Sequence, residues 1–245
     1  MSDQQRLESD LRAWETHLEQ SWCLPASFWR QGLVSHLPSG ANRAIWTAEG
    51  GIIECEDEVL ARQIATVIEA WSGRDHGSLL SAVGAVLRRK LPETSYMVDA
   101  SLNWRGAPGS LAGLILNEVE PVLPGAEGLP DLPEEVEHVF AIRIGGRIAS
   151  WVSNIPVLKI GDHWLYGLRV ETHRDYRRKG LGKAVVSALL EHIAAEEGSA
   201  LWVCKADNEA SFRMALSLGF AIHFYALSWK GKLAPSDHDP LGAEI

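Results

Sequence analysis

The loop Tyr176-Arg177-Arg178-Lys179-Gly180-Leu181-Gly182-Lys183 decides the fold of the C-terminal half of this chain. Its glycines let backbone N–H groups approach an anion, and a helix that begins beside the loop adds the positive end of its dipole. Such a helix is predicted from Leu181 to about Glu197, because apolar residues recur at helical spacing until Gly198. Four basic side chains add positive charge: Arg177, Arg178, Lys179 and Lys183. The pattern predicts a pyrophosphate-binding loop; a tight turn with solvated basic residues is the alternative that the loop alone leaves open.

Strands are predicted on both sides of this loop. Two extended runs flank Gly145-Gly146, a dipeptide that can supply the positive φ angles of a tight hairpin. After the loop and its helix, Asn208 or Asp207 caps a further helix that Gly219 ends. The predicted strands cover residues 136–143, 147–153, 164–170, 201–204 and 220–229.

The N-terminal half combines helices with short extended segments. Apolar residues at helical spacing predict helices at Leu7 to Leu18, Leu60 to Trp71 and Leu79 to Leu87, whereas residues 44–46 and 96–104 look extended. From Pro121 to Glu135, prolines, glycines and acidic residues give the composition of a linker or long surface loop. We therefore predict an N-terminal domain over residues 1–125, a C-terminal domain over 126–230 and a flexible tail over 231–245.

Composition narrows the class of protein. The formal net charge is -9, which argues against a general nucleic-acid surface. No apolar run approaches the roughly 20 residues of a membrane span, and the N-terminus lacks the apolar core of a secretory signal, so a cytoplasmic location is expected. Cys23, Cys55 and Cys204 form no C-x-x-C pair, which favours buried, reduced thiols over a zinc site or a disulfide framework.

From Val136 to Trp229 the sequence resembles the GNAT superfamily of acyl-CoA-dependent N-acyltransferases. The matching motifs, in order, are Leu168-Arg169-Val170, the R/Q-x-x-G-x-G/A loop at Arg177 to Gly182, Asn208 with Ser211, and Leu218-Gly219-Phe220. The resemblance implies an α/β (α+β) fold with a mixed, mostly antiparallel sheet flanked by helices, here preceded by a helical and partly extended N-terminal domain. For that domain two alternatives stay open, a substrate-recognising domain and a degenerate GNAT-like module. Within the superfamily, the segment from Trp202 to Phe220 is most similar to the zwittermicin-resistance-type acetyltransferases.

The same resemblance implies how an acyl-CoA would be held. The loop amides from Arg178 to Lys183 would bind the CoA pyrophosphate, and the strand edge at Leu168, Arg169 and Val170 would bind the pantetheine arm. The Val170 N–H would polarise the thioester carbonyl, while Asn208 and Ser211 would contact the lower pantetheine or its sulfur. For these last residues a core strand position, a helix cap and a first-turn position are the alternatives.

Catalytic residues are less clearly marked. Many members of the superfamily carry a tyrosine acid four residues before the Gly-Phe pair, where this chain has Ala215. A thiol with a pKa of about 8.5 can leave as a thiolate without a strong acid, and Ser211 and Tyr225 are weaker candidates for a proton donor. Glu171 and Tyr166 are the candidate catalytic residues, with Glu171 as the base that deprotonates the acceptor, directly or through water; a solvated charge is its alternative.

These features predict an N-acetyltransferase that moves an acetyl group from acetyl-CoA to a primary amine of a small molecule or peptide-like acceptor by direct attack. No metal, nucleic acid or membrane is expected to take part, and the chain is expected to be a monomer or homodimer. A catalytically weak CoA-binding regulatory or scaffold module is the main alternative, motivated by Ala215. A generic nucleotide-binding loop is a weaker one, because the P-loop ending and the Rossmann glycine spacing are both missing.

Overall fold

The computed structural model describes residues 3–21, 34–37, 42–47, 50–71, 76–88, 96–104, 119–205 and 208–229. The expected tail over 231–245 and Cys23 lie outside these residues. Cys55 and Cys204 are buried, as expected. Within the described part of the chain, no helix has both the length and the apolar character needed to cross a membrane.

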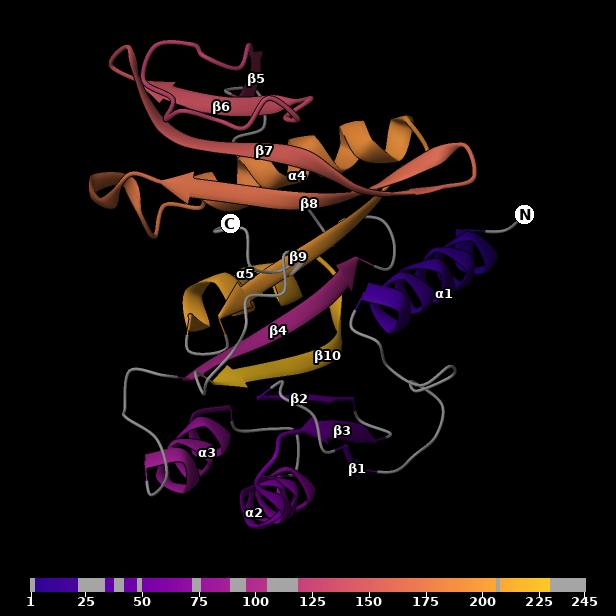
Figure 1. Ribbon diagram of the computed structural model, residues 1–245. Coiled ribbons are helices and arrows are strands. Elements are labelled where there is room, and N and C mark those ends of the chain that lie inside the picture. The colour runs from indigo at the N-terminus through magenta and orange to yellow at the C-terminus, as the bar shows by residue number, and fades with distance from the viewer. Residues whose placement is uncertain are drawn as a thin grey trace.

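A single twisted sheet organises the molecule (Figure 1). It has ten strands in the order β1-β3-β2-β10-β4-β9-β8-β7-β6-β5. The pairs β1–β3 and β8–β9 are parallel, and the other described pairs are antiparallel. The strands are β1 (Val34–Leu37), β2 (Arg43–Trp46), β3 (Gly51–Glu54), β4 (Tyr96–Trp104), β5 (Val119–Val122), β6 (Val139–Ile144), β7 (Arg147–Ile160), β8 (His163–Thr172), β9 (Ser199–Lys205) and β10 (Phe220–Trp229).

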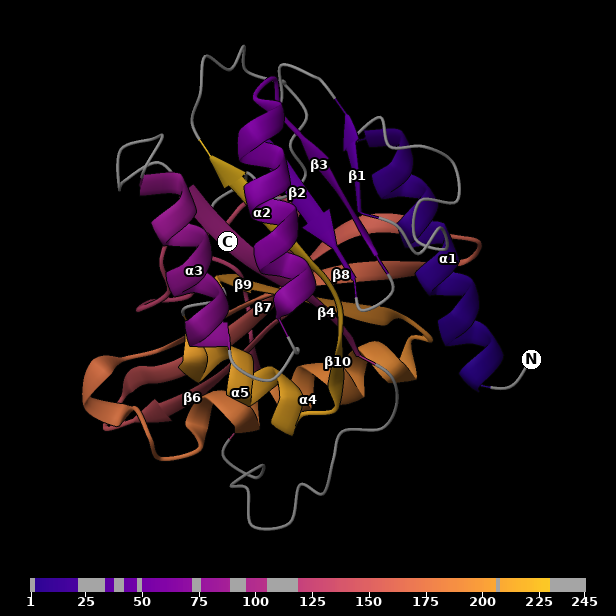
Figure 2. The same ribbon diagram turned by 90° about the horizontal axis from the view of Figure 1, so that it is seen from below.

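Helices cover both faces of this sheet. On one face lie α2 (Glu58–Ala70), α3 (His76–Arg88), α4 (Leu181–Ala195) and α5 (Glu209–Ser217). The first helix, α1 (Asp3–Ser21), covers the opposite face through the buried side chains of Trp14 and Leu18. Figure 2 shows α2 and α3 over the strands of the N-terminal half, and α4 and α5 beside those of the C-terminal half.

Alternation along the strands explains why both faces are covered. Leu165 and Leu201 pack in the core beneath α1, whereas their neighbours Tyr166 and Trp202 pack in the core beneath α4. Successive strand side chains point to opposite faces, so strands that are apolar at consecutive positions require a layer on each side. Polar contacts also hold α1 against the sheet. The buried carboxylate of Asp10 accepts a hydrogen bond from Ser199 Oγ and lies 2.7 Å from His163 Nε2.

The fold class is confirmed as a mixed, mostly antiparallel sheet flanked by helices. The predicted hairpin is present, with φ angles of 59° at Gly145 and 80° at Gly146. Two of the predicted strand and loop boundaries differ from the structure. Strand β7 continues seven residues past its predicted end at Ser153, to Ile160. Pro121 and Val122, which were predicted to belong to the linker, are part of the edge strand β5, where proline is tolerated.

The sheet crosses the expected domain boundary near residue 125. Strand β10 from the C-terminal half pairs with β2 on one side and β4 on the other, so the sheet runs unbroken between the two halves. Residues of both halves, including Trp46, Ile64, Trp202 and Tyr225, also share one apolar core. The division into domains 1–125 and 126–230 remains a prediction about folding units, and it does not correspond to separate sheets.

Candidate functional site

The site begins where β8 and β9 separate. These parallel strands pair only from Leu165–Ser199 to Gly167–Leu201. Beyond this point β8 stays paired with β7, and β9 stays paired with β4, so the two strands diverge (Figure 1). One edge of β8 from Leu168 to Thr172 is therefore left without a neighbouring strand among the described residues.

The backbone groups that face this open edge follow from the register. His173 N–H donates to Ala149 O, which makes these residues a hydrogen-bonded pair with β7. Hydrogen-bonded and non-hydrogen-bonded pairs alternate along an antiparallel ladder, so the backbones of Glu171 and Arg169 also bond to β7. The residues between them, Leu168, Val170 and Thr172, direct their backbone N–H and C=O groups to the other side of β8. Consistent with this, Thr172 O accepts a hydrogen bond of 3.0 Å from Arg177 Nε rather than from β7.

Helix α4 begins directly opposite this edge, and its first turn is uncapped. The first intrahelical bond is from Ala184 N–H to Gly180 O, so the amides of Leu181, Gly182 and Lys183 have no partner within the helix. Gly180, the N-cap residue, makes no side-chain cap. By contrast, Asp57 caps α2 and Asn208 caps α5. The first turn of α4 therefore offers free donors and the positive end of a helix dipole.

Two glycines give this turn its shape. Gly180 has a φ of 79° and Arg178 a φ of 63°, both in the left-handed region that side chains rarely adopt. Alternation of left-handed residues bends the backbone so that consecutive N–H groups converge on an anion. At Gly182 a Cβ atom would lie 3.0 Å from Thr172 Oγ1 and 3.4 Å from Met214 Sδ. The missing side chain lets α4 approach β8 and α5 closely.

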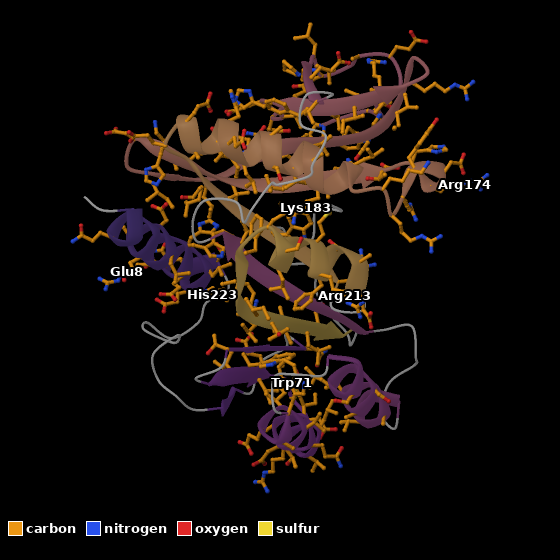
Figure 3. The ribbon with its side chains drawn as sticks, turned by 180° about the vertical axis from the view of Figure 1, so that it is seen from behind. Glu8, Trp71, Arg174, Lys183, Arg213 and His223 are labelled. Atoms are coloured by element: carbon orange, nitrogen blue, oxygen red, sulfur yellow. The ribbon has the colours of Figure 1, made fainter. Side chains whose placement is uncertain are left out.

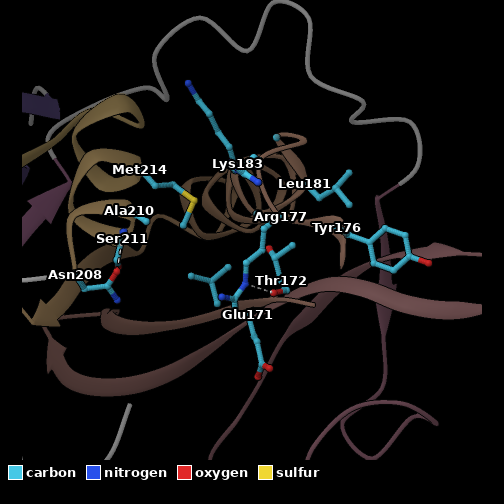
Figure 4. A pocket seen from close by; sticks show the side chains of 14 residues that line it. Glu171, Thr172, Tyr176, Arg177, Leu181, Lys183, Asn208, Ala210, Ser211 and Met214 are labelled. Carbon is cyan, nitrogen blue, oxygen red and sulfur yellow. Dashed lines mark hydrogen bonds between the residues drawn. The ribbon is translucent and has the colours of Figure 1, made fainter. Parts of the chain in front are cut away.

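A pocket of about 510 Å³ lies between these elements (Figure 4). Its volume is in the range of small-molecule sites, roughly 300 to 1,000 Å³. The end of β8, the loop, and the first turns of α4 and α5 form its walls. The lining residues are Val170, Glu171, Thr172, Tyr176, Arg177, Arg178, Gly180, Leu181, Gly182, Lys183, Asn208, Ala210, Ser211 and Met214.

Most of the predicted binding residues lie in this pocket, and three lie outside it. Leu168 is buried in the core, so only its backbone can reach the open edge. The Arg169 guanidinium carbon lies 5.5 Å from the centre of the Trp151 ring, on the face of the sheet away from α4. Lys179 Nζ lies 5.2 Å from the centre of the ring of Tyr176, and Lys179 is not among the residues that line the pocket. The charge of Lys179 can still attract an anionic ligand over a distance, although the side chain does not line the pocket.

The basic side chains are distributed around the loop. Arg177 is fixed by its bond to Thr172 O, and Lys183 lies between α4 and α5 (Figure 3). Arg174 points to solvent from the short 3-10 helix η4 (Arg174–Tyr176) that follows β8. A net charge of -9 over the whole chain makes this cluster a local exception. Its placement at an uncapped helix start suits an anionic ligand.

Asn208 and Ser211 form the wall on the side of α5, and both make structural bonds. Asn208 Oδ1 accepts from Ser211 N–H at 3.2 Å, which is the helix cap. Ser211 Oγ accepts from Trp202 Nε1 at 3.1 Å. The cap uses only the carbonyl oxygen of the Asn208 amide, and the hydroxyl hydrogen of Ser211 is not consumed by the tryptophan bond. Both side chains therefore retain a donor for a ligand.

The two predicted catalytic residues occupy different places. Glu171 lines the pocket at the open edge, and its carboxylate points away from α4 to the other face of the sheet (Figure 4). Tyr166 is buried under α4, outside the pocket, and its hydroxyl donates to Glu137 Oε2 at 3.0 Å. Burial and the carboxylates of Glu137 and Glu196 raise the pKa of Tyr166. Its hydroxyl thus stays neutral, and the side chain cannot reach the pocket as a base.

The weaker candidates for a proton donor also differ from expectation. Tyr225 lies in β10, 5.5 Å from the ring of Trp46 and 5.0 Å from that of Trp71, and burial raises its pKa. It does not line the pocket. Ala215, at the position where many family members have a tyrosine, belongs to α5 and is fully buried. Ser211 is the one of these candidates that lines the pocket.

Four lining residues were not predicted as site residues: Thr172, Tyr176, Ala210 and Met214. Thr172 shares a strand face with Val170, and Met214 follows Ser211 by one helical turn. Strand and helix periodicity therefore predicts both residues as pocket residues once the open edge of β8 and the α5 wall are known.

Residues 114–220 match the family model described as Acetyltransferase (GNAT) family. The match covers less than half of the chain, and it supports the predicted superfamily and the predicted enzyme class, an acyl-CoA-dependent N-acetyltransferase. The match does not support the narrower zwittermicin-resistance group. No curated protein matches the chain.

Solved structures of the family are similar at a distance. One described as an acetyltransferase of the GNAT family from Novosphingobium aromaticivorans has 17% identity and a TM-score of 0.43, over 58% of this chain and 67% of that one. A GCN5-related N-acetyltransferase-like protein from Streptococcus suis has 14% identity and a TM-score of 0.43, over 62% and 69%. The protein yncA from Salmonella typhimurium, solved with acetyl-CoA, has 18% identity and a TM-score of 0.32, over 41% and 69%.

Proposed function

We propose that the chain transfers an acetyl group from acetyl-CoA to a primary amine of a small molecule or peptide-like acceptor by direct attack. The observation that carries the proposal is the meeting of two features in one pocket: the open edge of β8 and the uncapped first turn of α4. The first suits an extended, amide-containing chain, and the second suits a diphosphate. A CoA thioester contains both.

Donor binding follows from these two surfaces. The amides of Leu181, Gly182 and Lys183 would bind the pyrophosphate, with Arg177, Arg178 and Lys183 adding positive charge. The open edge at Leu168 and Val170 would pair with the amides of the pantetheine arm as a neighbouring strand would. Asn208 and Ser211, across the pocket, would contact the end of this arm.

The reaction needs a polarised carbonyl and a deprotonated amine. An N–H of Val170 that faces the gap can donate to the thioester oxygen as negative charge develops there. Glu171 comes next along β8, with its carboxylate on the opposite face of the sheet (Figure 4). An acceptor that approaches from that face would meet the thioester at the gap and Glu171 beside it. Proton removal by Glu171, directly or through water, would then free the amine for attack.

Tyr166 and Tyr225 do not line the pocket, so neither is placed to protonate the departing CoA. The leaving thiol has a pKa of about 8.5, so it can depart as a thiolate at neutral pH. Ser211 is the nearest hydroxyl on the α5 wall. We assign it a binding role, since its oxygen already accepts from Trp202.

Turnover with a panel of amines tests the proposal. The chain is incubated with acetyl-CoA and, in turn, with polyamines, amino acids, amino sugars and short peptides, and thiol release is compared with acetylated product by mass spectrometry. We expect stoichiometric thiol and N-acetyl product with at least one amine class. Acetyl-CoA binding without turnover on any amine would contradict transfer and support a CoA-binding regulatory module, for which the buried Ala215 is the motivating observation.

A further inference from the structure

Two histidines and a glutamate meet at the far end of α4, away from the pocket. His138 precedes β6, His192 lies in the last turn of α4, and Glu196 is the C-cap of that helix. Glu196 Oε2 lies 3.4 Å from His138 Nε2, and Glu196 Oε1 lies 3.2 Å from His192 Nε2. The three ligand atoms lie within 4.8 Å of one another.

We propose that His138, His192 and Glu196 bind a divalent transition-metal ion of the Zn²⁺ type. Zinc is held by imidazole nitrogens and carboxylate oxygens at about 2.0 to 2.2 Å, which places neighbouring ligand atoms of a tetrahedral site roughly 3.4 Å apart. The two nitrogen–oxygen separations, each to a different oxygen of Glu196, are already close to this value. An ion could therefore enter with small movements of the side chains.

The ligands are held in place by the fold. His192 and Glu196 are four residues apart on one helix, so they lie on the same face one turn apart. His138 is fixed through its backbone: its N–H donates to Asn154 Oδ1 at 2.8 Å, and its C=O accepts from Asn154 N–H. Asn154 is fully buried in β7. The His138 and His192 rings pack edge to face, 4.2 Å between centres.

The electrostatic setting favours a cation. His192 Nε2 is buried and has no hydrogen-bond partner in the described part of the chain, since its approach to Glu196 has the distance of an ion pair without the direction of a hydrogen bond. A metal ion would satisfy this nitrogen. The site also lies at the C-terminal end of α4, where the helix dipole is negative. A further carboxylate, Glu137, is adjacent to His138 in sequence.

The donor set selects among metals. Two imidazoles and one carboxylate suit Zn²⁺ and its close analogues, whereas Ca²⁺ and Mg²⁺ require mainly oxygen ligands. Three protein ligands leave one tetrahedral position for water or for Glu137, whose carboxylate now accepts from Tyr166. The cysteine spacing of the sequence indicated no zinc site, but this cluster contains no cysteine.

A metal ion at this site would stabilise the fold, as a structural clamp between α4 and the start of β6, and would take no part in acyl transfer. It lies about 15 residues along α4 from Leu181, which corresponds to roughly 22 Å. An ion there would join α4 to the start of β6 and would neutralise Glu196 beside the buried Tyr166. The alternative is a metal-free cluster in which the two histidines contact Glu196 directly, and metal titration separates the two.

The test uses the 245-residue chain without a tag, stripped of metal with a chelator. It is equilibrated with Zn²⁺ and desalted, and bound zinc is measured by atomic emission while affinity is measured against a chromogenic chelator. We expect one zinc per chain and a rise in melting temperature. His192→Ala and Glu196→Gln should each weaken binding by at least about 10-fold, since loss of even an outer partner of a ligand typically costs 10-fold or more.

His17→Ala is the matched control, because His17 is a partly buried helical histidine on α1 at the opposite face of the sheet. It should leave zinc affinity unchanged. Co²⁺ supplies a second readout, since imidazole-bound tetrahedral Co²⁺ absorbs visible light and Glu196→Gln should change the spectrum. Zinc content equal in the native chain and Glu196→Gln, or less than one tightly bound ion in the native chain, would overturn the proposal. Glu196→Gln decides the matter if His192→Ala does not fold, because Glu196 is solvent-exposed.

Discussion

The two ends of α4 carry opposite chemistry. At the N-terminal end a glycine replaces a side-chain cap, the first amides are free of intrahelical partners, and basic residues surround a pocket. At the C-terminal end two histidines and a glutamate converge. The helix dipole favours an anion at the first end and a cation at the second. One helix can therefore supply a donor site and a separate metal clamp, and the two should respond to different perturbations.

The largest expected difference between the ends is in turnover. Glu171→Gln, at the end of the open strand, should lower kcat by about 100-fold or more without changing acetyl-CoA affinity, as loss of a general base does. Glu191→Gln, which removes an exposed carboxylate from α4, is the control and should leave kcat unchanged. The measurement is a pH–rate profile of each variant. If Glu171→Gln keeps the full rate and the acidic limb of the native profile, another group is the base.

A smaller effect, on acetyl-CoA affinity, is expected from removing a positive charge at the N-terminal end of α4. Lys183→Ala should weaken acetyl-CoA binding by about fivefold, equivalent to roughly 1 kcal/mol, which is the upper range for an exposed ion pair. Lys159→Ala removes a lysine that lies near Trp164 on the β7–β8 hairpin and should have no effect. Titrations at low and high salt should show the difference shrinking as salt screens the phosphates. Equal losses in both variants would mean that general charge, and not the loop, attracts the ligand.

The contribution of the side-chain caps of α5 and α2 can be measured as a change in the free energy of unfolding. Asn208→Ala removes the side-chain cap of α5 and should lower the free energy of unfolding by about 1 kcal/mol. Asp57→Ala, at the start of α2, should cost a similar amount. Urea unfolding of both variants gives the values. No loss at Asn208 would indicate that its side chain is held for a ligand and contributes little as a cap.

The smallest effect expected is that of metal removal on catalysis. Chelator treatment should lower the melting temperature of the chain but leave kcat unchanged, because the His138, His192 and Glu196 cluster is distant from the pocket along α4. Steady-state rates before treatment, after it and after Zn²⁺ is restored provide the comparison. A rate that falls with the chelator and returns with Zn²⁺ would show that the two ends are not independent.

Much of the N-terminal end of α4 could be predicted from the sequence, because its features are local. The glycine spacing, the basic residues and the helical periodicity from Leu181 all lie within one continuous segment. The same is true of the Gly145-Gly146 hairpin and of the Asn208 cap. In each case neighbouring residues determine the backbone conformation.

The rest depends on pairings between distant segments. The divergence of β8 from β9 follows from β9 pairing with β4, roughly 100 residues earlier in the chain. His192 and Glu196 could be seen as a pair on one helix, but only the β6–β7 register and Asn154 bring His138 to them. Tyr166 looked suitable for catalysis because it lies in the right strand, yet its side chain packs under α4 and bonds to Glu137.

The central claim is that the first turn of α4 binds the diphosphate of acetyl-CoA, and a calorimetric titration of two aspartate variants tests it most directly. Gly180→Asp places a negative charge at the uncapped turn, and aspartate tolerates the φ of 79° better than most residues. Gly125→Asp is the matched control: its φ is 84°, and a Cβ there meets nothing within 4 Å. We predict that Gly180→Asp weakens binding by about an order of magnitude or more while Gly125→Asp binds as the native chain does. Equal affinity in all three folded proteins would contradict the account.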